Sequence, residues 1–136
     1  MTMTMKRQGA MMQTIGRAYD PYEHARALGV KVVYRKLRTA NGLWIPDLNT
    51  ICLQTRMRSI HERSVLTHEI GHVWLGHTDA TPRQEVQADR WASRKLIDFT
   101  ELRRAAALTD DPGIWCHELN VSAKLLSRYM SDSRAS

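Results

Sequence analysis

Apolar residues recur at intervals of three and four positions in the middle of the chain, at Leu66, Ile70, Val73 and Trp74. This spacing puts them on one face of an α-helix that packs against a core. Ser59 precedes a glutamate by three positions, as in a capping box, and Gly76 follows the last apolar residues as a helix-ending glycine does. The pattern therefore predicts an amphipathic helix between Ser59 and Gly76.

A second helical stripe follows after a short polar loop. Thr81 and Pro82 are typical of the N-cap and first position of a helix. The apolar positions that follow have helical spacing and form the predicted buried face, at Ala88, Trp91, Ala92 and Leu96. Aspartates in the same capping role predict further helices after Asp20, Asp98 and Asp111.

Three short β-prone stretches precede the first of these two helices, at Val30–Leu37, Gly42–Ile45 and Thr50–Gln54. Loop and turn residues separate them. We expect a three-stranded antiparallel sheet. The fold class predicted is α+β, with a small sheet beside two long helices and a C-terminal helical pair.

Composition fits one globular domain, which we expect over residues 20–132, after a flexible N-terminal tail at residues 1–19. The chain of 136 residues is 43% hydrophobic and 25% charged, which favours neither disorder nor a membrane class. The net charge of +6 is scattered along the chain. Cys52 and Cys116 stand far apart without a Cys-x-x-C pattern, so we expect buried thiols in a cytoplasmic protein.

The predicted helix from Ser59 carries His68-Glu69-Ile70-Gly71-His72. Residues four positions apart share a helix face, so His68 and His72 can direct two imidazoles at one Zn²⁺ ion. Glu69 is rotated by about 100° from His68. It therefore fits the general-base position of H-E-x-x-H hydrolases.

A catalytic zinc site needs one more protein ligand, and the second helix supplies a candidate. Glu85 lies in its first turn, and Asp89 lies one turn further on the same face. The loop at residues 77–80 is short, so we expect the two helices to run nearly antiparallel and bring Glu85 beside His72. Asp89 then fits as the carboxylate that accepts the free N–H of a ligating histidine.

His77 could also belong to the site. A metzincin has Gly seven and His ten positions after its first histidine, whereas this chain has Leu75 and Thr78 there. We therefore interpret His77 as a loop histidine. The group that stabilises the oxyanion has no clear sequence signal; His77, Tyr34 and His61 are candidates for a substrate or oxyanion contact.

The C-terminal region has a second interpretation. Residues 112–131 contain a predicted helix, a short turn and a Ser-capped helix, as in a helix-turn-helix pair. Lys124 and Arg128 are its only clear phosphate partners, so a packing hairpin is favoured over a DNA reader. A DNA-binding regulator with a purely structural zinc site is the alternative hypothesis, although such a site has no use for Glu69.

Taken together, these motifs resemble the ImmA/IrrE-type metallopeptidases encoded by bacteria and their mobile elements. The resemblance runs from about Asp20 to Tyr129 and includes the His-Glu-Ile-Gly-His helix and the Glu85-Val86-Gln87-Ala88-Asp89 segment. Members often carry Asn where Asp89 stands and Phe where Trp91 stands. That departure leaves the predicted ligand Glu85 untouched.

The resemblance implies a zinc endopeptidase that cleaves a regulatory protein, commonly a helix-turn-helix repressor of the element that encodes it, in response to stress. It implies Zn²⁺ as cofactor and a protein as substrate. Nucleic acid is not the expected partner, and no membrane partner is expected.

Overall fold

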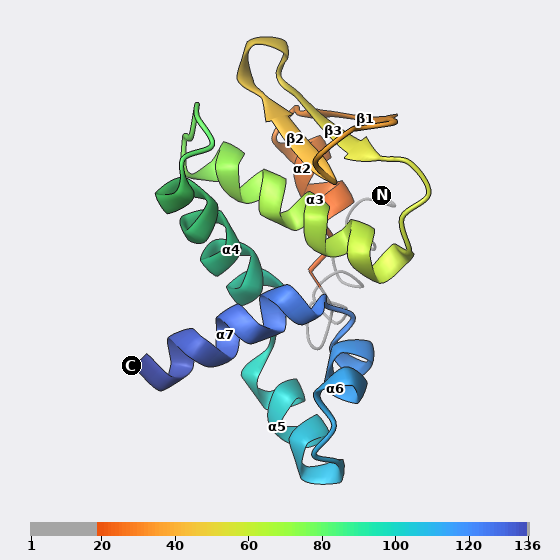
Figure 1. Ribbon diagram of the computed structural model, residues 1–136, viewed down its shortest axis with the longest axis vertical. Coiled ribbons are helices and arrows are strands. Elements are labelled where there is room, and N and C mark those ends of the chain that lie inside the picture. Colours follow the sequence, from red (N-terminus) through yellow and green to blue (C-terminus); the bar gives the residue numbers. More distant parts are fainter. Residues whose placement is uncertain (1–18, 136) are drawn as a thin grey trace, which may run out of the picture.

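The computed structural model describes residues 19–135, so the predicted N-terminal tail lies outside the described residues apart from Tyr19. The predicted α+β class is confirmed (Figure 1). In chain order the elements are α2 (Pro21–Ala27), β1 (Lys31–Arg35), β2 (Gly42–Ile45), the 3₁₀ turn η1 (Pro46–Leu48), β3 (Thr50–Gln54), α3 (Ser59–Trp74), α4 (Pro82–Leu96), α5 (Phe99–Leu108), α6 (Pro112–Leu119) and α7 (Ala123–Ala135).

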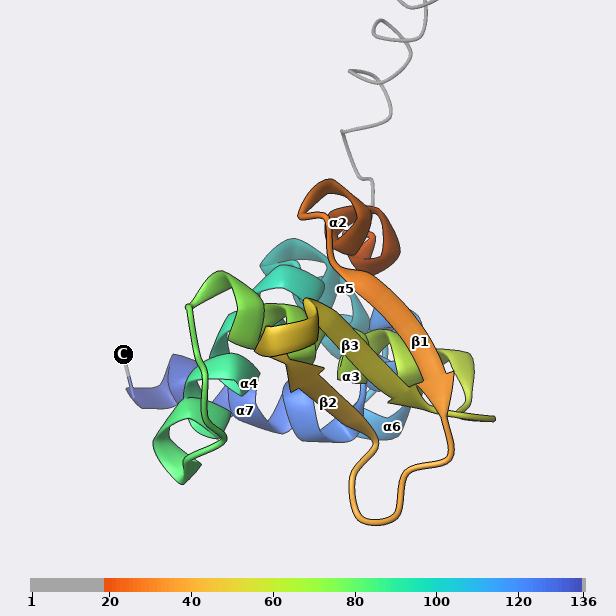
Figure 2. The same cartoon turned by 90° about the horizontal axis from the view of Figure 1, so that it is seen from above.

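The sheet is mixed, so the prediction of a fully antiparallel sheet is wrong in one pairing. The strand order is β1-β3-β2, with β1 parallel to β3 and β2 antiparallel to β3 (Figure 2). Strand β3 thus lies between the two strands that precede it, and the loop at residues 36–41 carries the chain from β1 across to β2. The Gln54 side chain holds that loop through hydrogen bonds with both the N–H and the carbonyl of Leu37, each at 2.9 Å. Because the strand order is β1-β3-β2, strand β2 is an edge of the sheet.

Helix α3 covers one face of this sheet. Ile51 and Leu53 of β3 pack against Leu66 and Ile70 of α3, and all four are fully buried. A second core lies among α4, α5, α6 and α7 and includes the fully buried Ala92 and Val121. The segment at residues 68–72 is therefore carried by a helix held between a sheet and a helical layer (Figure 1).

The capping box predicted at Ser59 is wrong. Arg58 is the N-cap of α3 and its side chain makes no capping bond. The Glu62 carboxylate instead accepts hydrogen bonds from the hydroxyls of Tyr22 and Tyr34, which tie α2 and β1 to α3. Gly76 ends α3 as predicted, with the positive φ of 73° that glycine adopts without strain.

The turn between α6 and α7 is attached to α3. The backbone N–H of Ser122 donates to Ser64 Oγ at 2.9 Å, and the Ser122 hydroxyl accepts from the Leu125 N–H at 3.3 Å. The Ser cap predicted for the last helix is confirmed. These bonds direct the first turn of α7 toward the middle of α3.

Within residues 19–135, no helix combines the length and the apolar character needed to cross a bilayer.

Gly42 controls how closely β2 approaches α3. A Cβ atom there would lie 2.6 Å from Val65 Cγ1 and 3.0 Å from Glu69 Cγ. We expect Gly42→Ala to lower the free energy of unfolding by about 1–3 kcal/mol, because the strand or the side chains of Val65 and Glu69 must shift to make room. Leu43→Ala, next on the same strand and 46% exposed, should cost roughly 0.5 kcal/mol at most. Urea denaturation measures both; equal stabilities for the two variants would contradict the tight strand–helix contact.

Candidate metal centre

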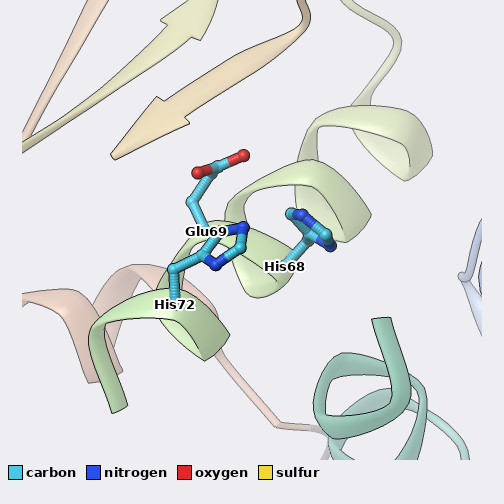
Figure 3. Close-up of side chains that lie close together, drawn as sticks. All are labelled: His68, Glu69 and His72. Atoms are coloured by element: carbon cyan, nitrogen blue, oxygen red, sulfur yellow. The ribbon is translucent and has the colours of Figure 1, made fainter. Parts of the chain in front are cut away.

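Helix α3 brings together His68, Glu69 and His72 (Figure 3). One ligand atom from each of the three lies within 4.8 Å of the others, and all three side chains are buried. The imidazoles share a face because four residues make about one helical turn. Glu69 extends from the same helix on the side of the sheet (Figure 3).

Helix α4 adds Glu85 to this group. Its two carboxylate oxygens lie 2.9 Å from His68 Nε2 and 3.1 Å from His72 Nε2. Thr81 caps α4 as predicted, since its hydroxyl accepts from the Gln84 N–H at 3.2 Å. The cap fixes the first turn of α4, in which Glu85 lies.

The nitrogen of His68 that faces away from Glu85 contacts Asp89. His68 Nδ1 lies 2.7 Å from Asp89 Oδ1, and both side chains are buried. Burial alone would lower the pKa of His68, but the hydrogen bond to Asp89 and the charges of the nearby carboxylates raise it. Burial would likewise raise the pKa of Asp89, but the bond from His68 and nearby positive charges, including that of Lys124, lower it. Asp89 therefore keeps Nδ1 of His68 protonated and leaves Nε2 directed at Glu85.

Glu69 occupies a different environment from Glu85. It is 6% exposed, it contacts Gly42, and it accepts a hydrogen bond from the backbone N–H of Trp44. Burial raises its pKa to about 7. A carboxylate with this pKa can take up and release a proton near neutral pH, as a general base must.

The donor set fits zinc. Zinc in proteins takes imidazole nitrogens and carboxylate oxygens at about 2.0–2.2 Å in tetrahedral geometry, which separates neighbouring donors by roughly 3.4 Å. Two Nε2 atoms that lie 2.9 and 3.1 Å from one carboxylate are close to that arrangement. Burial lowers the pKa of His72, which favours the neutral imidazole that can bind a metal.

Two cavities meet at the site. One of about 260 Å³ lies toward α7, and its lining includes Asn41, His61 and Lys124. The other, of about 440 Å³, lies toward the loop after α3, and its lining includes Leu43, Trp44 and Asp79. Gly42, Glu69 and Glu85 border both cavities. An extended chain could therefore cross the site beside β2.

The three residues predicted as substrate or oxyanion contacts lie in different parts of the site and its surroundings. His61 lines the smaller cavity, 3.2 Å from Asn41 Nδ2. Tyr34 donates to Glu62 at 2.9 Å and lines neither cavity. His77 is buried behind His72, with its Nδ1 2.9 Å from His72 Nδ1. An oxyanion contact by His77 or Tyr34 would require these bonds to be exchanged, and it stays a prediction.

Three features of the site were missed from the sequence: the Trp44 N–H bond to Glu69, the closeness of Lys124 to Asp89 at 3.6 Å, and the contact of His77 with Gln87. Gly42 within a β-prone stretch was a usable signal for the first, because glycine in a strand often marks a close approach. The other two join distant residues and have no local signal.

The two predicted phosphate partners of the C-terminal helices already contact carboxylates. Lys124 contacts Asp89, and Arg128 lies 3.8 Å from Asp132. The first turn of α7, which a recognition helix would place in the major groove, lies beside the metal centre instead. No observation in the described residues favours the DNA-binding hypothesis.

Comparison with known proteins identifies one family. The model of the IrrE N-terminal-like domain, Peptidase_M78, matches residues 25–130, which include every residue described for this site. No curated protein matches the chain.

We expect Asp89→Ala to weaken zinc binding by roughly 10–100-fold, because the tautomer and ring orientation of His68 are no longer fixed. Competition with a chromophoric zinc chelator measures the affinity. Lys124→Ala is the matched control, since it removes the other partner of Asp89 from a 74% exposed side chain and should leave the affinity nearly unchanged. An unchanged affinity for Asp89→Ala would show that Asp89 serves only to pair with Lys124.

Proposed function

The chain belongs to the Peptidase_M78 family of metallopeptidases, and we propose that it is a zinc-dependent endopeptidase that cleaves a regulatory protein. The observation that carries the proposal is the convergence of His68 Nε2 and His72 Nε2 on the Glu85 carboxylate, with buried Glu69 beside them.

In this proposal His68, His72 and Glu85 hold the metal, and Glu69 is the catalytic base. Glu69 is a poorer third ligand than Glu85, because its carboxylate is already bound by the Trp44 N–H on the side of the sheet. When bound, zinc would polarise the scissile carbonyl and make water more acidic. Glu69 takes the proton from the attacking water and passes it to the amine that leaves when the C–N bond breaks.

Strand β2 supports a peptide as the substrate. It is a sheet edge next to Glu69, and an extended peptide can pair with such an edge through backbone hydrogen bonds. The two cavities on either side of Glu69 would then receive side chains before and after the scissile bond. Since β2 has only four residues, it offers a short pairing surface and favours a specific partner over general proteolysis.

The identity of that partner rests on the family resemblance. We propose a helix-turn-helix repressor of a bacterial mobile element, cleaved at one site. We also propose a cytoplasmic location, in keeping with two free cysteines, Cys52 and Cys116.

Glu69→Gln should keep zinc and substrate but lose turnover, because the amide preserves the shape and cannot accept the proton. Used as a trap in the native host, this variant should co-purify with its substrate, which the parent chain then cleaves at one site. Mass spectrometry of the products measures the cleavage.

Glu62→Gln is the matched control for the trap. It is the same substitution on the same helix, at a carboxylate bound by Tyr22 and Tyr34 and outside both cavities, so it should cleave at close to the parent rate. Cleavage of the trapped protein by Glu69→Gln at the parent rate would rule out Glu69 as the base.

A further inference from the structure

The nitrogen of His72 that faces away from Glu85 contacts a second histidine. His72 Nδ1 lies 2.9 Å from His77 Nδ1, and the two ring planes meet at 61°. The turn at Gly76 brings His77 back under α3, where its backbone N–H donates to the His72 carbonyl at 2.9 Å. His77 is 7% exposed, so its ring nitrogens need protein partners.

The other ring nitrogen of His77 contacts α4. His77 Nε2 lies 2.8 Å from Gln87 Oε1. An amide oxygen only accepts hydrogen bonds, so His77 Nε2 must carry a hydrogen and donate it. In a neutral imidazole the remaining nitrogen is then an acceptor. His77 Nδ1 therefore accepts, and the hydrogen between the two rings belongs to His72 Nδ1.

The His72 nitrogen that faces Glu85 then carries no hydrogen. With its hydrogen on Nδ1, neutral His72 has a lone pair on Nε2, and this lone pair faces Glu85 Oε2 at 3.1 Å. Two acceptors at that distance repel each other unless a cation lies between them. The chain of bonds from Gln87 thus prepares His72 Nε2 to bind a metal ion.

We propose that His77 and Gln87 are positioning residues that hold His72 in the tautomer with Nε2 free for the metal. The proposal rests on the metallopeptidase function above and extends it to two residues behind His72. His72 would be supported by a histidine and an amide, whereas His68 is supported by the Asp89 carboxylate at 2.7 Å. The two ligands would then differ in basicity, since a carboxylate partner raises the basicity of a ligating imidazole more than an uncharged partner does.

Gln87 can be substituted without a change to the two cavities beside Glu69. With His77, Gln87 lines a separate cavity of about 590 Å³ on the other side of His72, whose remaining walls include Trp91 and Arg94. Neither His77 nor Gln87 lines the cavities beside Glu69. Changes at Gln87 can therefore test the support of His72 separately from substrate contact.

The first experiment uses two substitutions at Gln87 that differ in hydrogen bonding. Gln87→Met removes the acceptor and should weaken zinc binding by roughly tenfold, at the lower end of the effect of outer partners. Gln87→Glu can only accept, so it forces the same donation from His77 and should keep the parent affinity within about threefold. His77→Phe should weaken it by roughly 10–100-fold. Chelator competition measures the zinc affinity, and circular dichroism checks the fold.

Arg94→Ala is the control, because it alters the same cavity without touching His77 and should bind zinc as the parent does. Equal losses for Gln87→Met and Gln87→Glu, or no loss in either, would overturn the proposal. A loss in Gln87→Met alone supports it.

The second experiment does not depend on zinc or on peptidase activity. In the metal-free parent chain, at a pH where the imidazoles are neutral, ¹⁵N NMR of the histidine side chains should show His72 protonated at Nδ1 and His77 protonated at Nε2. His72 protonated at Nε2 would overturn the proposal even if zinc binds. Conversely, a parent chain with these tautomers that binds no zinc would refute the proposed function and leave the assignment of His77 and Gln87 intact.

Discussion

The close crossing of α3 and α4 at Gly71 brings the two helices of the candidate metal centre together. A Cβ atom at Gly71 would lie 3.1 Å from Trp91 Cε3 and 3.2 Å from the Ala88 carbonyl oxygen, so only glycine lets the helices approach this closely without displacement. Gly71 lies between the two histidines in the sequence, and Ala88 lies between Glu85 and Asp89. The contact therefore sets how far the carboxylates of α4 stand from the imidazoles of α3.

This crossing also explains how so many polar groups can be buried together. His68, Glu69, His72, His77 and Asp89 are all buried polar side chains. Burying such groups without partners costs several kcal/mol. Each of them has a hydrogen-bond partner within the site, and apolar cores lie on both sides of α3. Packing and hydrogen bonds of this kind suit a site whose ligands must be in place before a metal binds.

Local spacing was sufficient to predict which residues gather. His68 and His72 follow from one helical turn, and Glu85 and Asp89 from the next helix with its Thr-Pro start. Pairings between segments that are distant in the sequence were harder to predict. The parallel pairing of β1 with β3 was missed because strand propensity contains no information on strand order. The capping box failed because Tyr22 and Tyr34, distant in sequence, compete for the Glu62 carboxylate. The contact of His77 with Gln87 depends on the three-dimensional turn at Gly76.

We propose that the two carboxylates of the site have different roles, with Glu85 as metal ligand and Glu69 as base. Native mass spectrometry of zinc-loaded chains tests this most directly. We expect one zinc per chain for the parent and for Glu69→Gln, and substoichiometric zinc for Glu85→Gln, since an amide is a poor zinc ligand. Full zinc occupancy in Glu85→Gln together with its loss in Glu69→Gln would show that Glu69 is the ligand and that the two roles are exchanged.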